Sequence, residues 1–333
     1  MLSRVAESVC WMGRYLERAE NVARFVEVNL YLGLDSQAGA EQQWEPLIYT
    51  TGDQELFAER YGAATQENVI RFLAFDGEYS NSILSCLRLA RENARSIRES
   101  LPAEIWEHLN RFYLTVQEAA LEPPSCGGAH GFFHEVKEAG RLFDGITAAT
   151  LSRGDAWHFL RLGQMLERAD KTSRILDVKY FMLLRSAADV GTPFDDVQWA
   201  AVLRSASAFE MYRQQYGRIS PRGIVEFLLL DAGFPRAIRF CLNQARKSMH
   251  ALSGVSMDRF SNPAEKLLGQ LCSELTYAEV SGVLKGGLHE YLDGLQTKMN
   301  QVSQGIFDTY FARRVPSKGA QVRMGGPSAQ AAV

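Results

Sequence analysis

The chain repeats part of its own sequence, and this repetition limits its fold more than any other feature. The segment GRYLERAE at 13–20 returns as GQMLERAD at 163–170, a shift of 150 residues. Further matches follow in the same order at shifts of 155 and 159 residues, among them Trp44 with Trp199, Cys86 with Cys241 and His130 with His289. Matched blocks in one order indicate a tandem duplication. We predict a first helical repeat over 1–150 and a second over 151–314 that packs with it as one unit.

The spacing of apolar residues predicts helices almost throughout. Val9, Met12, Leu16 and Ala19 recur at intervals of three and four residues, which places them on one helix face. The segment 225–230 has the composition of a buried strand, but its matched segment, 69–74, contains an arginine and follows a helix start, so a helix is favoured. We therefore predict an all-α protein, an internally duplicated bundle of about a dozen helices with a pseudo-twofold relation between its halves. The last residues, 315–333, lack apolar periodicity and are predicted to be a disordered tail.

Composition makes several kinds of partner unexpected. The 333 residues include 36 Lys and Arg and 39 Asp and Glu, a net charge of −3. Such a chain has no overall field that would concentrate a nucleic acid. No stretch approaches the ~20 apolar residues that cross a membrane, and the first residues lack the apolar core of a signal peptide. The five cysteines have no metal-ligand spacing, and no glycine-rich phosphate loop is present, so we expect a cytoplasmic protein without metal or cofactor.

The most specific pattern is a charged stripe beside the apolar face of the repeated helix. At ~100° per residue, Arg14, Arg18 and Asn21 point away from that face, and Gln164 is likewise expected to be exposed. The stripe itself consists of Gly13, Glu17, Glu20, Arg24 and Glu27 in the first copy and of Gly163, Glu167, Asp170, Arg174 and Asp177 in the second. A glycine inside a helix is unfavourable, and close helix crossing would explain it.

Two interpretations of the stripe stay open. In the structural one, Glu20–Arg24 and Asp170–Arg174 are ion pairs between residues four apart on one helix. In the functional one, Glu17, Glu20, Glu167 and Asp170 meet in a polar cavity, raise one another's pKa and act as acid and base. A metal–carboxylate centre is a remote alternative, since the Glu-x-x-His pattern of such bundles is absent from these helices.

Arginines could serve the same site. Arg91 and its match Arg246 lie at the margin of an apolar helix face, and we hypothesise that they complete the acidic stripes across a helix interface. Together with Arg24 and Arg174 they are the candidates for binding an anionic group, because guanidinium recognises carboxylate or phosphate through two bonds. Asp76 and Asp231 each precede a predicted helix and are expected to cap it.

Several of these segments resemble the bacterial alpha-E family, a helical domain of unknown function. The resemblance rests on RVAES at 4–8, GRYLERAEN at 13–21, ARENAR at 90–95, WHFLRLG at 157–163 and ERAD at 167–170. By position, the family's glutamates fall on Glu7, Glu17, Glu20 and Glu167, with Asp170 where the second copy often has an acid.

The resemblance also implies partners. Genes of the family lie beside, or are fused to, circularly permuted ATP-grasp ligase-like proteins, and transglutaminase-like peptidases are frequent neighbours. It thus implies a helical accessory or substrate-presenting partner of an ATP-grasp-type amidoligase in peptide or amide-bond formation. An enzyme of the same pathway that uses Glu17/Glu20 and Glu167/Asp170 is the alternative.

Overall fold

The computed structural model describes residues 1–35, 44–124, 126–185 and 193–312, and within them it is entirely helical. Fifteen α-helices and no strand occur in these ranges, so the all-α prediction is confirmed. The segment 225–230 is helical, as predicted. The predicted disordered tail, 315–333, lies outside the described residues. None of the described helices combines the length and the apolar character needed to cross a membrane.

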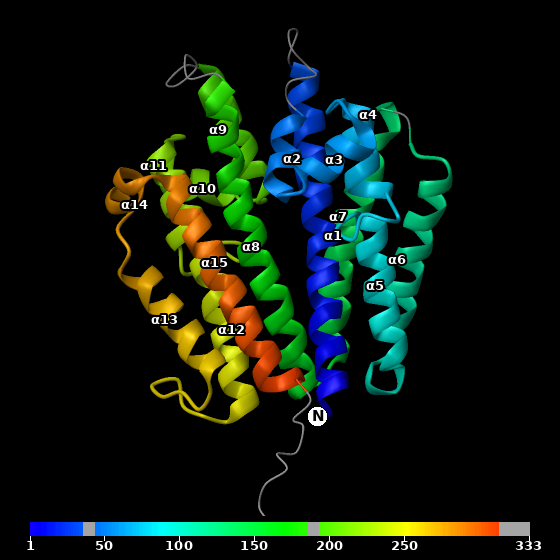
Figure 1. The fold of residues 1–333 in the computed structure, drawn as a ribbon, viewed down its shortest axis with the longest axis vertical. Helices are drawn as coiled ribbons and strands as arrows, with labels where there is room; N and C mark the ends of the chain where they lie inside the picture. The colour runs from blue at the N-terminus through cyan, green and yellow to red at the C-terminus, as the bar shows by residue number, and fades with distance from the viewer. Residues whose placement is uncertain (36–43, 125, 186–192, 313–333) are drawn as a thin grey trace, which may run out of the picture.

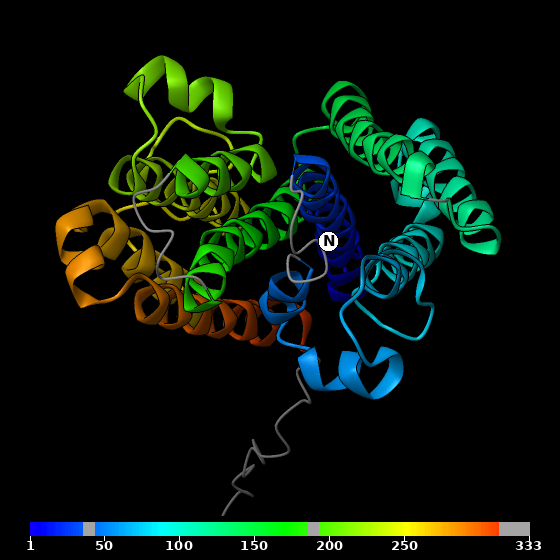
Figure 2. The ribbon, with the colours of Figure 1, turned by 90° about the horizontal axis from the view of Figure 1, so that it is seen from above.

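Two long helices form the centre of the molecule. Figure 1 shows α1 (Ser3–Asp35) and α8 (Asp155–Arg185) side by side in the middle, and Figure 2 shows them again at the junction of two groups of helices. The two helices pack more extensively against each other than any other pair. Their apolar faces supply Met12, Leu16, Leu162 and Leu166 to the core.

The remaining helices divide between the two sides of this central pair. Helices α5 and α7 pack on α1, while α12 and α15 pack on α8. Two helices cross this division, since α2 packs on α8 and α9 packs on both central helices. The first group comprises α2 (Glu45–Thr51), α3 (Gln54–Tyr61), α4 (Gln66–Ile70), α5 (Ile83–Ser96), α6 (Ala103–Leu121) and α7 (Cys126–Thr150). The second comprises α9 (Pro193–Ser205), α10 (Phe209–Tyr216), α11 (Pro221–Leu230), α12 (Ile238–Ser253), α13 (Pro263–Tyr277), α14 (Val280–Gly286) and α15 (Leu288–Ile306). Short helical turns follow α4, α5 and α15, at Arg71–Phe75, Arg98–Ser100 and Phe307–Phe311.

The repeated glycines let α1 and α8 approach closely. A Cβ atom at Gly13 would lie 2.8 Å from the Leu160 carbonyl oxygen, and one at Gly163 would overlap the Cys10 carbonyl oxygen. A side chain at either position would therefore push the two backbones apart, which is the close crossing that the sequence predicted. The crossing brings the polar sides of both helices against each other.

Residues matched in the sequence make corresponding contacts in the two groups. Phe57 stacks on Tyr61 with ring centroids 5.7 Å apart, and the matched Tyr212 stacks on Tyr216 at 4.9 Å. The ring of Phe72 meets the first pair edge-on, as Phe227 meets the second. The duplication itself remains an inference from the sequence, and these contacts are what a duplicated unit would make.

Candidate functional site

The Glu-Arg dipeptides at 17–18 and 167–168 exchange partners across the two central helices. Glu17 on α1 accepts hydrogen bonds from Arg168 on α8, at 2.9 Å from Nε and 2.6 Å from Nη2. Glu167 on α8 accepts from Arg18 on α1, at 2.6 Å from Nε and 3.1 Å from Nη2. Both pairs use the two-pronged geometry that makes arginine–carboxylate contacts strong. We call these four residues and the charged side chains around them the charged seam.

One side of the seam, bordered by α7 and the start of α12, surrounds Glu17. Arg236 donates to Glu17 and to Glu20, in each case at 3.0 Å, and Asn21 donates to Glu17 at 2.8 Å. Arg24 forms an ion pair with Glu20 four residues earlier. Glu17, Glu20, Asn21 and Arg24 are all buried. We call this side the α7 face.

The other side, bordered by α15 and by the chain just before α5, surrounds Glu167. Arg14 donates to Glu167 at 3.0 Å, and Lys171 lies 3.5 Å from the same carboxylate. Asp170 pairs with Lys171 at 3.1 Å and with Arg174 at 3.0 Å. We call this side the α15 face.

The prediction that crowded acids have raised pKa values is wrong for Glu17, Glu167 and Asp170, whose pKa values are lowered. Burial alone would raise the pKa of Glu17, but Arg168 and Arg236 outweigh it and hold that pKa at about 2. Burial is likewise outweighed at Glu167 by Arg18, Lys171 and Arg14, which keep its pKa well below the usual range. The pKa of Asp170 is also lowered, because Lys171 and Arg174 outweigh its burial. Carboxylates held ionised in this way are poor proton donors near neutral pH.

The helix wheel places Arg14, Arg18 and Asn21 away from the apolar face, and its prediction that Gln164 is exposed is wrong. Asn21 is fully buried, Gln164 is buried, and both arginines are largely covered. The wheel assigns one face of a helix to the core, whereas α1 is covered on several sides by α5, α7 and α8. Its polar side is buried because the polar side of α8 meets it.

The arginine candidates divide into two sets. Arg24 and Arg174 belong to the seam, whereas Arg91 and Arg246 have other partners. Arg91 donates to Asn110 at 2.7 Å and pairs with Glu92 at 3.2 Å. Arg246 donates to the carbonyl of Met257. The geometry therefore does not support Arg91 and Arg246 as the groups that complete the acidic stripes. The predicted site residue Glu7 also lies away from the seam, because it precedes Glu17 by ten residues, about 15 Å along α1.

Asp76 and Asp231 brace loops instead of capping α5 and α12. The N-cap of α5 is Ser82, and that of α12 is Ala237. Asp76 accepts from the backbone N–H groups of the second and third residues after it, at 2.8 and 3.0 Å. Asp231 does the same at 2.7 and 2.6 Å. Both carboxylates thus fix a loop that ends at the seam.

These loops carry two seam residues that the sequence did not reveal. Arg236 closes the second loop and reaches Glu17, and Asn81, its match at a shift of 155, accepts from Arg18 at 2.6 Å. The sequence signal that could have found them is the aspartate five residues before each, Asp76 before Asn81 and Asp231 before Arg236. A third missed residue is Asp144 on α7, which accepts from Gln164 at 2.7 Å and lies 3.4 Å from Arg168.

Asp144 differs from the four predicted acids. Its side chain is 37% exposed, against at most 14% for theirs, and its burial together with the nearby Glu17 and Glu20 outweighs Arg168, so its pKa is raised. A carboxyl group with a raised pKa at an accessible edge is a candidate for proton exchange with a ligand.

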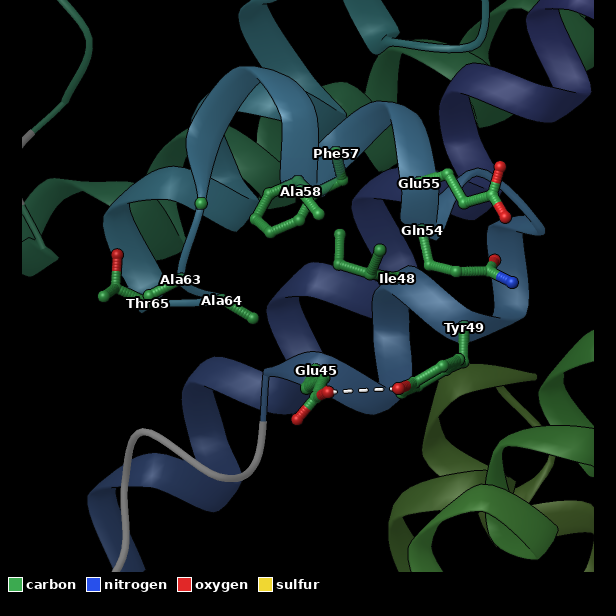
Figure 3. A pocket seen from close by; sticks show the side chains of 11 residues that line it. Glu45, Ile48, Tyr49, Gln54, Glu55, Phe57, Ala58, Ala63, Ala64 and Thr65 are labelled. Carbon is green, nitrogen blue, oxygen red and sulfur yellow. Dashed lines mark hydrogen bonds between the residues drawn. The ribbon is translucent and has the colours of Figure 1, made fainter.

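Three hollows of the described residues lie away from the seam. The one in Figure 3 lies between α2, α3 and the chain leading to α4, with Ile48 and Phe57 on its wall and a hydrogen bond of 3.2 Å from Tyr49 to Glu45 at its edge; its volume is about 560 Å³. A second, of about 520 Å³, lies between α6 and α7 beside His108. A third, of about 650 Å³, lies between α14 and the adjoining ends of α13 and α15. None of the predicted site residues lines any of the three. Within the described ranges, no three His, Cys, Asp or Glu side chains gather as possible metal ligands.

Comparison with known families decides the relationship. The model of a family described as "a predicted alpha-helical domain with a conserved ER motif" matches residues 1–311. The chain belongs to the Alpha-E family. Three Glu-Arg dipeptides occur in this Alpha-E chain, at 17–18, 59–60 and 167–168, and the first and last are the two that exchange partners in the seam.

Curated relatives of this Alpha-E chain are longer than it is. An uncharacterised protein of Mycobacterium bovis and another of Mycobacterium tuberculosis are each 22% identical to it over 345 residues. The matched region covers 97% of this chain but 38% of each relative. The chain therefore spans about two fifths of the length of these relatives. No solved structure matches it.

Proposed function

We propose that the chain is a helical scaffold that acts with an ATP-grasp-type amidoligase in peptide or amide-bond formation, as an accessory or substrate-presenting partner. The observation that carries the scaffold role is the exchange of glutamate–arginine pairs in the charged seam. The acids that could have served catalysis are engaged in joining α1 to α8. Because two-pronged buried pairs have demanding geometry, they fix the register of the two central helices.

The length of the relatives supports a role beside another protein unit. In the mycobacterial proteins a region like this chain makes up 38% of the length, so it is joined there to a larger portion of different sequence. Fused units in one protein often correspond to partners that bind each other. An ATP-grasp ligase as the partner, and a transglutaminase-like peptidase as a second, come from the family resemblance and are part of the proposal.

An experiment in the native host tests the ligase partnership. The chain is tagged at its own locus and isolated from cells, and co-purifying proteins are identified by mass spectrometry. We expect an ATP-grasp protein encoded near it, and we expect the isolated ligase to turn over ATP faster when the chain is added. Absence of a complex, together with an unchanged ligase rate, would reject the proposal.

One observation favours a second candidate, an enzyme of the same pathway. Asp144 combines a raised pKa with a partly exposed side chain at the edge of the α7 face, where a substrate can reach it. Asp144→Asn should then abolish pathway output while leaving the melting temperature and the ligase complex intact. Output equal to that of the wild type would remove this candidate.

A further inference from the structure

The two faces of the charged seam differ in their charge balance. In the ion pairs of the α7 face, three acids meet three arginines: Glu17, Glu20 and Asp144 with Arg24, Arg168 and Arg236. In those of the α15 face, two acids meet four cations: Glu167 and Asp170 with Arg14, Arg18, Lys171 and Arg174. The α15 face therefore carries two more positive than negative charges.

The difference arises at positions that the sequence matches to each other. Arg14 on the α15 face corresponds to Gln164 on the α7 face, and Lys171 corresponds to Asn21. At each of these two positions the α15 face has a cation where the α7 face has a neutral amide. On the α7 face Arg236 adds one cation, and Asn81 stands at its matched position. The negative charge of Asp144 then offsets one arginine of the α7 face. Its match at a shift of 159 is Ser303, whose neutral hydroxyl accepts a hydrogen bond from Arg14 and adds no negative charge to the α15 face.

Neighbouring groups halve the excess on the α15 face. Asp177, the next acid along α8, lies 2.8 Å from His289 of α15 and also interacts electrostatically with Arg174, so one positive charge stays in excess. On the opposite side of the seam, Glu27 pairs with Lys137, and Arg161 borders the α7 face through a hydrogen bond to Gln164. The surplus cations thus lie around Glu167 and Asp170.

The surplus cations are partly accessible. The side chains of Arg14, Lys171 and Arg174 are exposed by 17%, 15% and 26%, so each has an edge that a small ligand can reach. The Arg14 guanidinium lies 4.9 Å from the centre of the Trp11 ring, and that of Arg18 lies 5.7 Å from the Tyr15 ring. The rings restrict the arginines to defined positions, and like charges held together in a partly desolvated place attract a counter-ion.

We propose that the α15 face of the charged seam binds an oxyanion, a phosphate or carboxylate group of a ligand, through Arg14, Lys171 and Arg174. Guanidinium and ammonium groups beside each other recognise this chemistry by charge and by hydrogen bonds. The site goes beyond the scaffold role and does not depend on the ligase. The surplus positive charge favours an anionic ligand group over a neutral one.

Calorimetric titration of the full chain with inorganic pyrophosphate and, separately, with citrate tests the site. Sodium chloride keeps the ionic strength constant, so that general screening is the same in every titration. We expect saturable binding of at least one probe. Binding of pyrophosphate alone assigns a phosphate ligand, binding of citrate alone assigns a carboxylate ligand, and binding of neither overturns the proposal.

Matched substitutions locate the binding. Arg14→Gln and Lys171→Asn give the α15 face the residues that the α7 face has, and each should weaken binding at least tenfold. Arg141→Gln makes the same change of charge on an exposed part of α7 and should leave the affinity unchanged. Lys171→Arg keeps the charge and should keep the binding.

A folding control and a second variant keep the test valid if one variant misfolds. Circular dichroism verifies the helical content of each variant, and if Lys171→Asn does not fold, Arg14→Gln decides. Affinity equal to that of the wild type in Arg14→Gln, or an equal loss in Arg141→Gln, would overturn the assignment to this face.

Discussion

Glu17 and Glu167 are buried carboxylates, and their position would be unfavourable without the arginines of the opposite helix. Each loses its water and receives two hydrogen bonds from one guanidinium in return. Such a pair adds little net stability compared with apolar packing, but removal of one partner leaves a buried charge alone. The Glu-Arg dipeptide of each helix therefore supplies half of the contact between α1 and α8, and the same dipeptide on the other helix supplies the other half.

Glu17→Gln tests this role. The substitution leaves Arg168 and Arg236 without their shared carboxylate, and we expect the free energy of unfolding to fall by about 3–5 kcal/mol. Glu274→Gln is the control, because Glu274 and Lys298 form an equally short ion pair on the surface, at 2.6 Å. There the expected loss is about 0–1 kcal/mol. Urea unfolding measures both, and equal losses would contradict a structural role for burial at Glu17.

The lowered pKa of Glu17 also predicts how stability depends on pH. The pKa is about 2 in the folded chain against 4.5 as the ordinary value, so the unfolded chain binds a proton first as the pH falls. The contribution of Glu17 to stability is complete above about pH 4.5 and is lost between that value and about pH 2. Glu167 and Asp170 add to this loss, since their pKa values are lowered as well.

Acid titration of wild type and Glu17→Gln measures the effect. The stability of the variant should decline less steeply below pH 4.5, because one of the groups that must be protonated is gone. Parallel curves for the two proteins would show that the Glu17 carboxylate is not held ionised by the fold.

At the scale of helices, the central feature is the close crossing of α1 and α8. Gly13 and Gly163 permit it, and it is the crossing that brings each Glu-Arg dipeptide within reach of the other. Helix α1 then needs a polar side that fits the polar side of α8, in addition to its apolar faces. Packing and electrostatics here impose the same register on the two helices.

Gly163→Ala tests the crossing. The added methyl group would overlap the Cys10 carbonyl oxygen of α1, and the strain should exceed the gain in helix propensity, with a net loss of about 1–3 kcal/mol in unfolding free energy. Gly145→Ala in α7 is the control, because a Cβ atom there meets no atom within 4 Å. Alanine should stabilise that helix by about 0.5–1 kcal/mol. Thermal or urea unfolding of both variants provides the comparison, and a stabilised Gly163→Ala would rule out the close contact.

The helices were predictable from the sequence, and the seam was predictable only in part. Apolar spacing predicted helices almost throughout, because periodicity is a property of each segment alone. The repeat drew attention to Glu17 and Glu167. Their true partners could not be found, because a helix wheel contains no information about a second helix. Arg236 lies in the loop before α12 and Asp144 lies in α7. Both are far from Glu17 in the sequence, and only the folded chain brings them to the seam.

At the scale of the whole molecule, the seam makes the two halves dependent on each other. Each half contributes the acid of one exchanged pair and the arginine of the other, so neither half contains a complete exchanged pair of its own. Figure 2 shows the two groups of helices on either side of α1 and α8, the two helices that carry the exchanged pairs. Because a buried ion pair that lacks one partner is strongly unfavourable, separation would leave charged and apolar surface exposed in both halves. The two repeats should therefore behave as one cooperative unit.

Fragments that correspond to the repeats test this dependence. Residues 1–150 and 151–333 are produced alone and together, and we expect each alone to be unfolded or aggregated and the two to co-purify as a helical complex. Arg18→Glu in the first fragment would face Glu167 with a like charge and should abolish the complex, because repulsion replaces the two hydrogen bonds of the exchanged pair. Arg141→Glu makes the same change of charge on exposed α7 and should leave the complex intact. Circular dichroism and size-exclusion chromatography measure the outcome, and a first fragment that folds alone with full helical content would show that the seam joins two independent domains.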